Sequence, residues 1–433
     1  MTQIEIGYFM IAGLLGLLAL GVPIALSLIL AGGVGLIAIR GEMAASFILE
    51  SFAFTSAGSL ALIVVPLFVF MGQLALSAGM SDKAYRAAKA WFGHLPGGLP
   101  IATIFACAGF STVCGSSVAT AAIVSKATIP EMLRAGFSQR LAGGCVAVAG
   151  TLGVLIPPSG ILIIYSIATH VSIADLFIGA LLPGALTAVV YATGTYLMVR
   201  GNKELVQRTV LPRMAWGERV KATLQAWEVG FLFVVVIGSI YLGWATATEA
   251  AGIGALIALI FALVRKNRPK GSIQKGLLEA GSSTATIFFL IIGSALFSVA
   301  LSTTQLPTVI AAYVTSFDLH PTVLLLLLLI PYLVMGSFID GISMIFLTMP
   351  VVFPIITEAG INPVVFGIVV TKMVEIGAVT PPVGLNVFVV KGAVPELQLG
   401  EVFRGVVPYL LMDLLVVVAI ILVPGLVTLP IGG

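Results

Sequence analysis

Two stretches of this 433-residue chain combine residue types that can present main-chain oxygens to an ion. They run from Gly150 to Gly160, around Pro157-Pro158, and from Glu375 to Asn386, around Pro381-Pro382. Proline lacks an N–H and clashes with the carbonyl one turn back, so each pair should break the helix that contains it. Both stretches lie in long apolar segments. Carbonyls freed at membrane depth persist only where they are buried in protein or line a cavity.

A third stretch, Phe110–Thr120, carries serine and threonine on both sides of Gly115. Such residues suit the tip of a hairpin whose carbonyls and hydroxyls face a bound ion. Sodium is a hard cation and should prefer oxygen ligands, as calcium and magnesium do. The alternative is that these small residues only allow helices to approach closely. The neighbouring break at Pro157-Pro158 favours the ion site.

Asp340 stands in a polar interruption, Gly336–Gly341, of another apolar stretch. An acid at membrane depth is costly and is by default a functional candidate, here for a substrate or an ion. It could ligate a cation, carry a proton or orient a substrate. The alternative is that the tip reaches water and Asp340 caps a short helix.

Three other charged residues are predicted to have structural roles. Lys372 and Glu375 stand three residues apart, so they can pair on one helix face. Glu249 stands at an expected helix start, where an acid complements the helix dipole. None of the three is predicted to do chemistry.

The composition indicates a polytopic helical membrane protein. Hydrophobic residues make up 59% of the chain and charged residues 9%, whereas soluble proteins carry about 25% charged residues. The sequence contains no phosphate-binding loop of the ATPase type and no basic tract suited to nucleic acid. No paired carboxylates, Ser/His pair or metal cluster falls in the apolar segments, so we predict no enzyme activity and no metal other than sodium.

Apolar runs of about 17–25 residues are long enough to span a bilayer. We predict ten spans, near residues 5–20, 22–39, 60–78, 140–166, 176–199, 227–244, 248–264, 281–303, 364–390 and 406–426. Two further apolar stretches, 101–125 and 322–356, are predicted to be re-entrant hairpins. The first lies between basic segments, and 25 residues cannot cross a bilayer twice.

The distribution of Lys and Arg predicts the orientation. Most Lys and Arg residues fall in four segments, 79–100, 126–140, 200–221 and 265–275. Basic segments of membrane proteins are usually cytoplasmic, so we predict that these four are. Five predicted loops have almost no basic residues and should lie outside. These loops are 40–58, 167–175, 245–249, 304–321 and 357–363. Both termini then lie outside. Residues 391–405 could be a loop or an interfacial helix.

The chain repeats itself at an offset of 224 residues. This offset places Pro157 on Pro381, Gly153 on Gly377 and Ser116 on Asp340. Because one hairpin should enter from the cytoplasm and the other from outside, we predict two inverted repeats, about 60–200 and about 281–426, within a single transmembrane transporter domain spanning 1–433. Interrupted helices in corresponding positions of two repeats indicate the binding site of a secondary transporter.

At these motifs the chain resembles the large membrane subunit, or permease, of tripartite ATP-independent periplasmic (TRAP) transporters, which belong to a wider ion-transporter superfamily. The resemblance runs along essentially the whole chain. It is carried by four motifs, namely Cys114–Thr120, Gly150–Ser159, Thr246–Ala251 and Ile376–Asn386. The family more often has serine where Cys114 stands.

The resemblance implies sodium-driven symport of an organic acid across the bacterial inner membrane by an elevator-type movement. It also implies two partners, a periplasmic substrate-binding protein and a small four-helix membrane subunit, and no organic cofactor. Carried over by motif, one sodium site would use Ser111, Ser116, Gly153, Ile156 and Pro157. The other would use Gly336, Gly377, Thr380 and Val383. A standalone carrier or channel of the related dicarboxylate or anion type, without a binding protein, is the alternative.

Overall fold

The computed structural model describes residues 2–57, 60–206, 211–265 and 271–432. Within these residues every named element is a helix, and one isolated pairing of extended backbone joins Phe137 to Val206. The predicted all-α class is therefore confirmed. The predicted cytoplasmic segments 200–221 and 265–275 lie partly outside the described residues.

Most of the α-helices follow one another with short connections. In chain order they are α1 (Gln3–Ala19), α2 (Ile24–Arg40), α3 (Glu42–Ala57), α4 (Val64–Ser77), α5 (Met80–Phe92), α6 (Gly98–Cys114), α7 (Ser117–Arg134), α8 (Gln139–Ala149), α9 (Leu152–Leu155), α10 (Gly160–Thr169), α11 (Ile173–Gly201), α12 (Trp216–Gln225), α13 (Trp227–Tyr241), α14 (Ala247–Val264), α15 (Ser272–Thr303), α16 (Leu306–Thr315), α17 (Pro321–Gly336), α18 (Gly341–Glu358), α19 (Pro363–Val379), α20 (Leu385–Ala393), α21 (Leu399–Leu422) and α22 (Gly425–Thr428).

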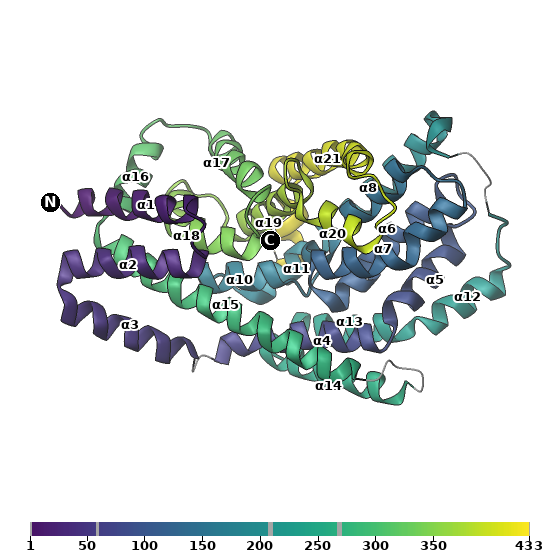
Figure 1. Cartoon of the computed structure of the whole chain (residues 1–433), viewed down its shortest axis with the longest axis horizontal. Helices are drawn as coiled ribbons and strands as arrows, with labels where there is room; N and C mark the ends of the chain where they lie inside the picture. Colours follow the sequence, from purple (N-terminus) through teal and green to yellow (C-terminus); the bar gives the residue numbers. More distant parts are fainter. Residues whose placement is uncertain (1, 58–59, 207–210, 266–270, 433) are drawn as a thin grey trace.

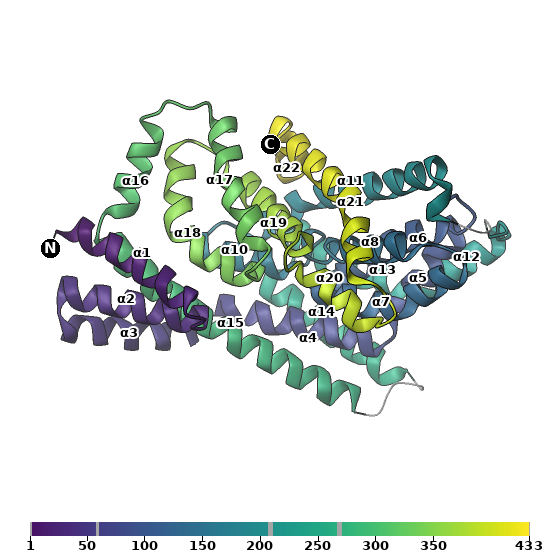
Figure 2. The same ribbon diagram turned by 45° about the horizontal axis from the view of Figure 1, so that its top comes forward.

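A long lateral layer runs beside the rest of the molecule. Figures 1 and 2 show α1–α3 at one end, next to the N-terminus, and α15 extending from them towards α4 and α14. Glycines allow α2 and α15 to touch through their main chains. A Cβ on Gly32 would lie 2.8 Å from the Cα of Phe297, and one on Gly293 would lie 2.7 Å from the Ala25 carbonyl oxygen. Small residues at such contacts are typical of helix packing in membranes.

Both predicted helix breaks are confirmed. Helix α9 ends at Leu155 and α10 begins at Gly160, with a bend of 43° between the segments on either side. In the second half, α19 ends at Val379 and α20 begins at Leu385. The peptide bond within each proline pair is cis.

The two predicted hairpins are helix–turn–helix units that correspond at the same offset. We call α6 and α7 the first hairpin and α17 and α18 the second hairpin. Ser116 caps α7, and its side chain accepts the Ala119 N–H at 3.3 Å. Asp340 caps α18, and its side chain accepts the Ser343 N–H at 3.1 Å. The repeat in the sequence is thus also a repeat in local structure, and its inverted sense stays a prediction.

Two of the segments that were predicted to be external loops contain helices. Residues 40–58 contain α3, and residues 304–321 contain α16. A scarcity of basic residues predicts on which side of the membrane a segment lies, but not whether its backbone is helical. The sequence of α3 contains several residues that favour a helix, such as Ala, Met, Leu and Glu. Residues 391–405 contain the end of α20 and the start of α21, so they are neither a continuous loop nor a separate interfacial helix.

The helix lengths bear on the number of spans. Five described helices, α11, α14, α15, α18 and α21, are long and apolar enough to cross a membrane, and up to eight spans result if each bent pair counts as one. Helices α1 and α2 have 17 residues each. Large apolar side chains are exposed along the long helices, for example Leu197 of α11, Leu256 of α14 and Leu415 of α21. Exposed apolar surface of this kind suits contact with a membrane or another protein. The number of ten spans stays a prediction.

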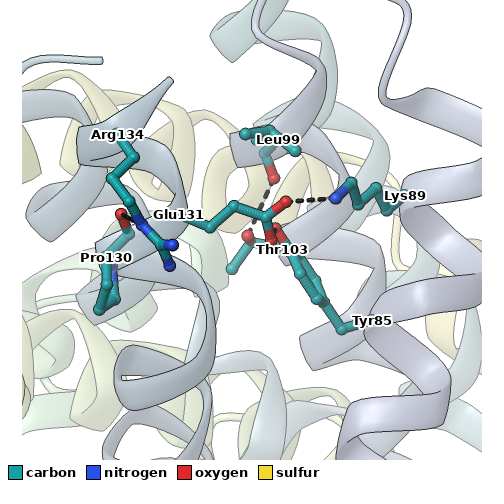
Figure 3. A network of polar contacts seen from close by, with 7 residues as sticks. All are labelled: Tyr85, Lys89, Leu99, Thr103, Pro130, Glu131 and Arg134. Carbon is teal, nitrogen blue, oxygen red and sulfur yellow. Dashed lines mark hydrogen bonds and ion pairs between the residues drawn. The ribbon is translucent and has the colours of Figure 1, made fainter. Parts of the chain in front are cut away.

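The amphipathic helix α5 connects the first hairpin to α13. Figure 3 shows Lys89 and Tyr85 of α5 pointing at Glu131 of α7. Lys89 forms an ion pair with Glu131, and the Tyr85 hydroxyl donates to the same carboxylate at 3.0 Å. On the other side, Lys83 pairs with Glu228 of α13 at 2.6 Å. These contacts hold α5 between two parts of the fold that the sequence alone did not connect.

Candidate ion and substrate site

A cavity of about 790 Å³ lies where the two hairpin turns and the two broken helices meet. Its lining includes Ser116 from the first hairpin, Asp340 from the second, Pro158 from the first break and Val383 from the second. Helices α4 and α15 close another side, through residues such as Phe68. Ligand pockets are typically about 300–1,000 Å³, so the cavity can hold a small organic molecule.

The hairpin part of the first predicted sodium site lies at the end of α6 and the start of α7. Ser116 lines the cavity and caps α7. Ser111 is buried, its hydroxyl donates to the Cys107 carbonyl, and its own carbonyl accepts the Gly115 N–H at 3.3 Å. The two serines therefore sit on either side of the turn, and Ser116 is the one that reaches the cavity.

The broken-helix part of this site packs directly on the hairpin. A Cβ on Gly153 would lie 2.7 Å from the Ser116 carbonyl oxygen, so only glycine allows this approach. Ile156 turns the other way, since a Cβ on Gly184 of α11 would lie 2.8 Å from its side chain. Its main chain and that of Pro157 remain in the break between α9 and α10. Gly153 and Ser116 are thus brought together.

The second predicted site has the same construction. A Cβ on Gly377 would lie 2.5 Å from the Cα of Gly336, so the main chains of α19 and the second hairpin touch. Thr380 ends α19, and its hydroxyl donates to the Ile376 carbonyl at 2.6 Å, which leaves oxygen lone pairs for a further contact. Val383 lines the cavity in the break before α20.

The proline pairs explain why oxygen atoms are free at both breaks. In a regular α-helix, a carbonyl accepts the N–H of the residue four positions later. Four positions after Gly153 and Gly377 stand Pro157 and Pro381, which have no N–H. The Gly377 carbonyl accepts the Thr380 N–H at 3.0 Å instead, and its second lone pair stays available. Both breaks therefore supply main-chain oxygens, which suit a hard cation.

The charged side chains of the cavity are all acidic. Among its described lining residues they are Glu279, Asp340 and Glu375, without any Lys, Arg or His. Asp340 lines the cavity and caps α18, as the capping interpretation predicted, and its role towards a substrate or an ion stays a prediction. Glu279 also forms an ion pair with Lys275 at 3.8 Å, and Glu375 is buried. The described lining therefore offers no basic side chain to an organic anion, which would favour entry together with cations.

The predicted pair between Lys372 and Glu375 is wrong. Lys372 forms an ion pair with Asp413 of α21, and the two side chains are 2% and 1% exposed. Glu375 instead accepts a hydrogen bond at 3.2 Å from Ser117 of the first hairpin. Spacing on one helix showed which residues could meet, but a buried partner on another helix offered Lys372 a shorter contact. Glu375 is left facing the cavity.

Sequence reasoning missed Asp413 and its network. The Tyr191 hydroxyl of α11 donates to Asp413, and Lys372 lies 3.3 Å from the same hydroxyl. Next to it, the Tyr409 hydroxyl lies 2.7 Å from Thr195. An acid in the middle of the apolar helix α21 was the available signal. Glu249, by contrast, lies in the first turn of α14, as predicted, and forms a capping box with Thr246.

The family of the chain follows from comparison with known proteins. A family model described as "Tripartite ATP-independent periplasmic transporter, DctM component" matches residues 11–426. The large permease protein DctM of a C4-dicarboxylate TRAP transporter from Pseudomonas aeruginosa is 36% identical over 365 residues, which cover 84% of each chain. The sialic acid TRAP transporter large permease protein SiaM from Vibrio cholerae is 32% identical, with 95% of each chain covered.

Two further similarities concern architecture. The isethionate TRAP transporter permease protein DctMQ from Oleidesulfovibrio alaskensis is 32% identical over 97% of this chain, which covers 65% of that longer protein. The structure of the YdaH transporter from Alcanivorax borkumensis superimposes with a TM-score of 0.65, at 16% identity and with 90% of each chain covered. This last similarity supports the membrane-transporter fold alone. The chain belongs to the DctM family of TRAP transporter large permeases, and it is a multi-pass membrane transport protein, not an enzyme.

Proposed function

We propose that this chain imports an organic acid across the bacterial inner membrane together with sodium ions. The cavity carries the proposal, because both hairpin turns and both helix breaks meet there. The relatives are named for C4-dicarboxylate, isethionate and sialic acid, all of which carry an acidic group. Sodium at the two breaks would offset the acidic lining of the cavity and allow an anion to enter.

In this proposal, the first sodium ion takes oxygens from Ser111, Ser116 and the break from Gly153 to Pro157. The second takes oxygens from Gly336, Gly377 and Thr380, with the main chain of Val383. Asp340 remains the candidate for direct contact with a substrate or an ion. All of these groups lie at or beside the cavity, so ion binding and substrate binding would stabilise the same arrangement of hairpins and breaks.

The proposal includes two partners. A periplasmic binding protein would deliver the substrate, in keeping with the description of the family as tripartite. A small four-helix membrane subunit would support the lateral layer of helices, and the greater length of the DctMQ relative leaves room for such a component in one chain. The two halves would be inverted repeats, and the group of hairpins and breaks would move as an elevator against α2, α4, α14 and α15.

The sidedness of the hairpins can be tested by cysteine labelling in intact cells, after the three native cysteines are replaced. Phe338→Cys, at the exposed turn of the second hairpin, should react with a membrane-impermeant maleimide added from the periplasmic side. Thr112→Cys, near the turn of the first hairpin, should react only when the cytoplasmic side is opened. The same accessibility for both positions would contradict the inverted arrangement.

Reconstitution tests the function itself. In liposomes that contain only this chain, an inward sodium gradient should drive negligible uptake of free substrate. Addition of the small membrane subunit and the cognate binding protein should produce sodium-dependent uptake. The binding protein's ligand, identified by thermal-shift screening of candidate acids, defines the substrate used.

Robust uptake by the chain alone would support the alternative, a standalone carrier or channel of the related anion-transporting type. Uptake that requires both partners but does not depend on the sodium gradient would support the tripartite assembly and contradict sodium coupling.

A further inference from the structure

Thr120 of α7 carries a buried hydroxyl that has no hydrogen-bond partner. Its side chain is 0% exposed. Burying a hydroxyl without a partner costs about 1–3 kcal/mol, so such a group in a folded protein calls for a physical reason. Its backbone is ordinary, because the Thr120 N–H donates to the Ser116 carbonyl at 3.1 Å.

Other buried hydroxyls of the same helix behave differently. The Thr128 hydroxyl donates to the Val124 carbonyl at 2.9 Å, and the Ser125 hydroxyl donates to the Ala121 carbonyl. This return to the carbonyl one turn back is the usual solution for such residues inside a helix. The Thr120 hydroxyl does not take it, so the oxygen is directed elsewhere.

The neighbourhood of Thr120 is the first candidate ion site. A Cβ on Gly153 would lie 2.9 Å from the Thr120 Oγ1 and 2.7 Å from the Ser116 carbonyl oxygen. The absence of a Cβ at Gly153 therefore lets the main chain of α9 pack directly against both the Ser116 carbonyl and the Thr120 hydroxyl. The one polar side chain recorded as interacting with the Thr120 hydroxyl in the described part of the chain is the Cys114 thiol, and sulfur is a weak hydrogen-bond partner that does not replace an oxygen.

We propose that the Thr120 hydroxyl is a further oxygen ligand of the sodium ion at the first site, beside Ser116 and Gly153. This inference rests on the proposed sodium coupling and deepens it. Each hydroxyl has two lone pairs, so Thr120 can face the ion with oxygen and turn its hydrogen away. A sodium ion there would supply the partner that the Thr120 hydroxyl lacks among the described protein atoms.

The second site lacks this ligand. At the offset of 224 residues, Met344 corresponds to Thr120, and the methyl end of Met344 lies near Gly336. Oxygen is the ligand that a hard cation prefers, and a thioether is a soft one. The two sites are therefore chemically unequal, and loss of the Thr120 hydroxyl should weaken only the first.

The test uses the complete complex, with this chain, the small membrane subunit and the binding protein. Thr120→Val keeps the shape and removes the oxygen. The melting temperature of the purified complex is measured across a sodium titration with choline as the balancing cation, and sodium-driven uptake is measured in liposomes. We expect the sodium concentration for half-maximal stabilisation to rise by about 5- to 150-fold.

Without sodium, we expect the variant to melt at the same temperature as the wild type or higher, because the unpartnered hydroxyl is gone. At saturating sodium, the melting temperature of the variant should rise by less than that of the wild type. A merely structural threonine would lower the melting temperature equally under both conditions. The matched control is Thr128→Val on the same helix, which removes a hydroxyl bonded within the helix and should leave the sodium titration unchanged.

If Thr120→Val does not fold, the pair Thr120→Ser and Thr120→Ala isolates the hydroxyl, because both lose the methyl group and only serine keeps the oxygen. Serine should retain the wild-type sodium titration and alanine should not. An unchanged titration in the valine variant, or equal titrations for serine and alanine, overturns the inference while sodium coupling stands. A wild-type complex that does not respond to sodium overturns sodium coupling itself and the inference with it.

Discussion

Asp413→Asn should lower the free energy of unfolding by about 3–5 kcal/mol, since removal of one partner leaves a buried charge uncompensated. Lys372 and Asp413 are almost completely buried and join α19 to α21, next to Tyr191 of α11. The variant keeps the size of the side chain and loses its charge. Thermal or chemical unfolding of the purified protein in detergent measures the change.

Glu401→Gln is the matched control. Glu401 forms an ion pair at 2.8 Å with Arg404 on the same helix, and the Arg404 side chain is 72% exposed. Exposed pairs contribute about 0–1 kcal/mol, so this variant should unfold almost like the wild type. A Lys372→Met, Asp413→Leu double variant should recover much of the stability, because well-packed apolar residues often replace a buried pair without loss. Equal stability of Asp413→Asn and Glu401→Gln would show that the buried pair does not hold α19 in place.

Thr380→Val should raise the sodium concentration needed for half-maximal transport by about 5- to 150-fold. The loss of one oxygen ligand should cost about 1–3 kcal/mol, and about 1.4 kcal/mol is a factor of ten in affinity. Thr380 stands at the end of α19, where the helix breaks, and its side chain is only partly buried. Sodium-dependent uptake by the reconstituted complex measures the effect, while docking of the binding protein should be unchanged.

Thr187→Val provides the comparison for Thr380→Val. The Thr187 hydroxyl also donates to a carbonyl of its own helix, at 2.8 Å, but it is buried in α11 and does not line the cavity. Its loss should leave sodium dependence unchanged. If Thr380→Val is expressed normally and has the sodium dependence of Thr187→Val, then Thr380 does not ligate the second ion.

Local chemistry explains why so much of the fold could be predicted. A proline pair inside an apolar segment interrupts its helix, so the breaks between α9 and α10 and between α19 and α20 could be predicted, although not the residues at which the helices end. The cap at Asp340, one of the interpretations that the sequence offered, is local in the same sense, because its side chain accepts an N–H three residues away. The repeat at one offset then indicated that the two hairpins and the two helix breaks belong together. The cavity is lined by residues from all four of these segments.

The parts that could not be predicted depend on contacts between distant segments. Ser117 meets Glu375 across 258 positions, and Lys372 prefers a carboxylate on α21 to one on its own helix. Nothing in the spacing of either residue identifies such a partner. Thr120 belongs to the same class, since only the packing of α7 on Gly153 shows that its hydroxyl lacks a partner. Predicting these features requires the tertiary structure.

The freed carbonyls at the two breaks also have a consequence for sequence variation. A main-chain oxygen has the same chemistry whichever side chain its residue carries, so a position such as Val383 can change without removing a ligand. What must remain is the missing N–H of Pro157 and Pro381 and the absence of a Cβ at Gly153 and Gly377. Under the proposed function, relatives could diverge in the side chains that face the cargo while keeping the same ion sites.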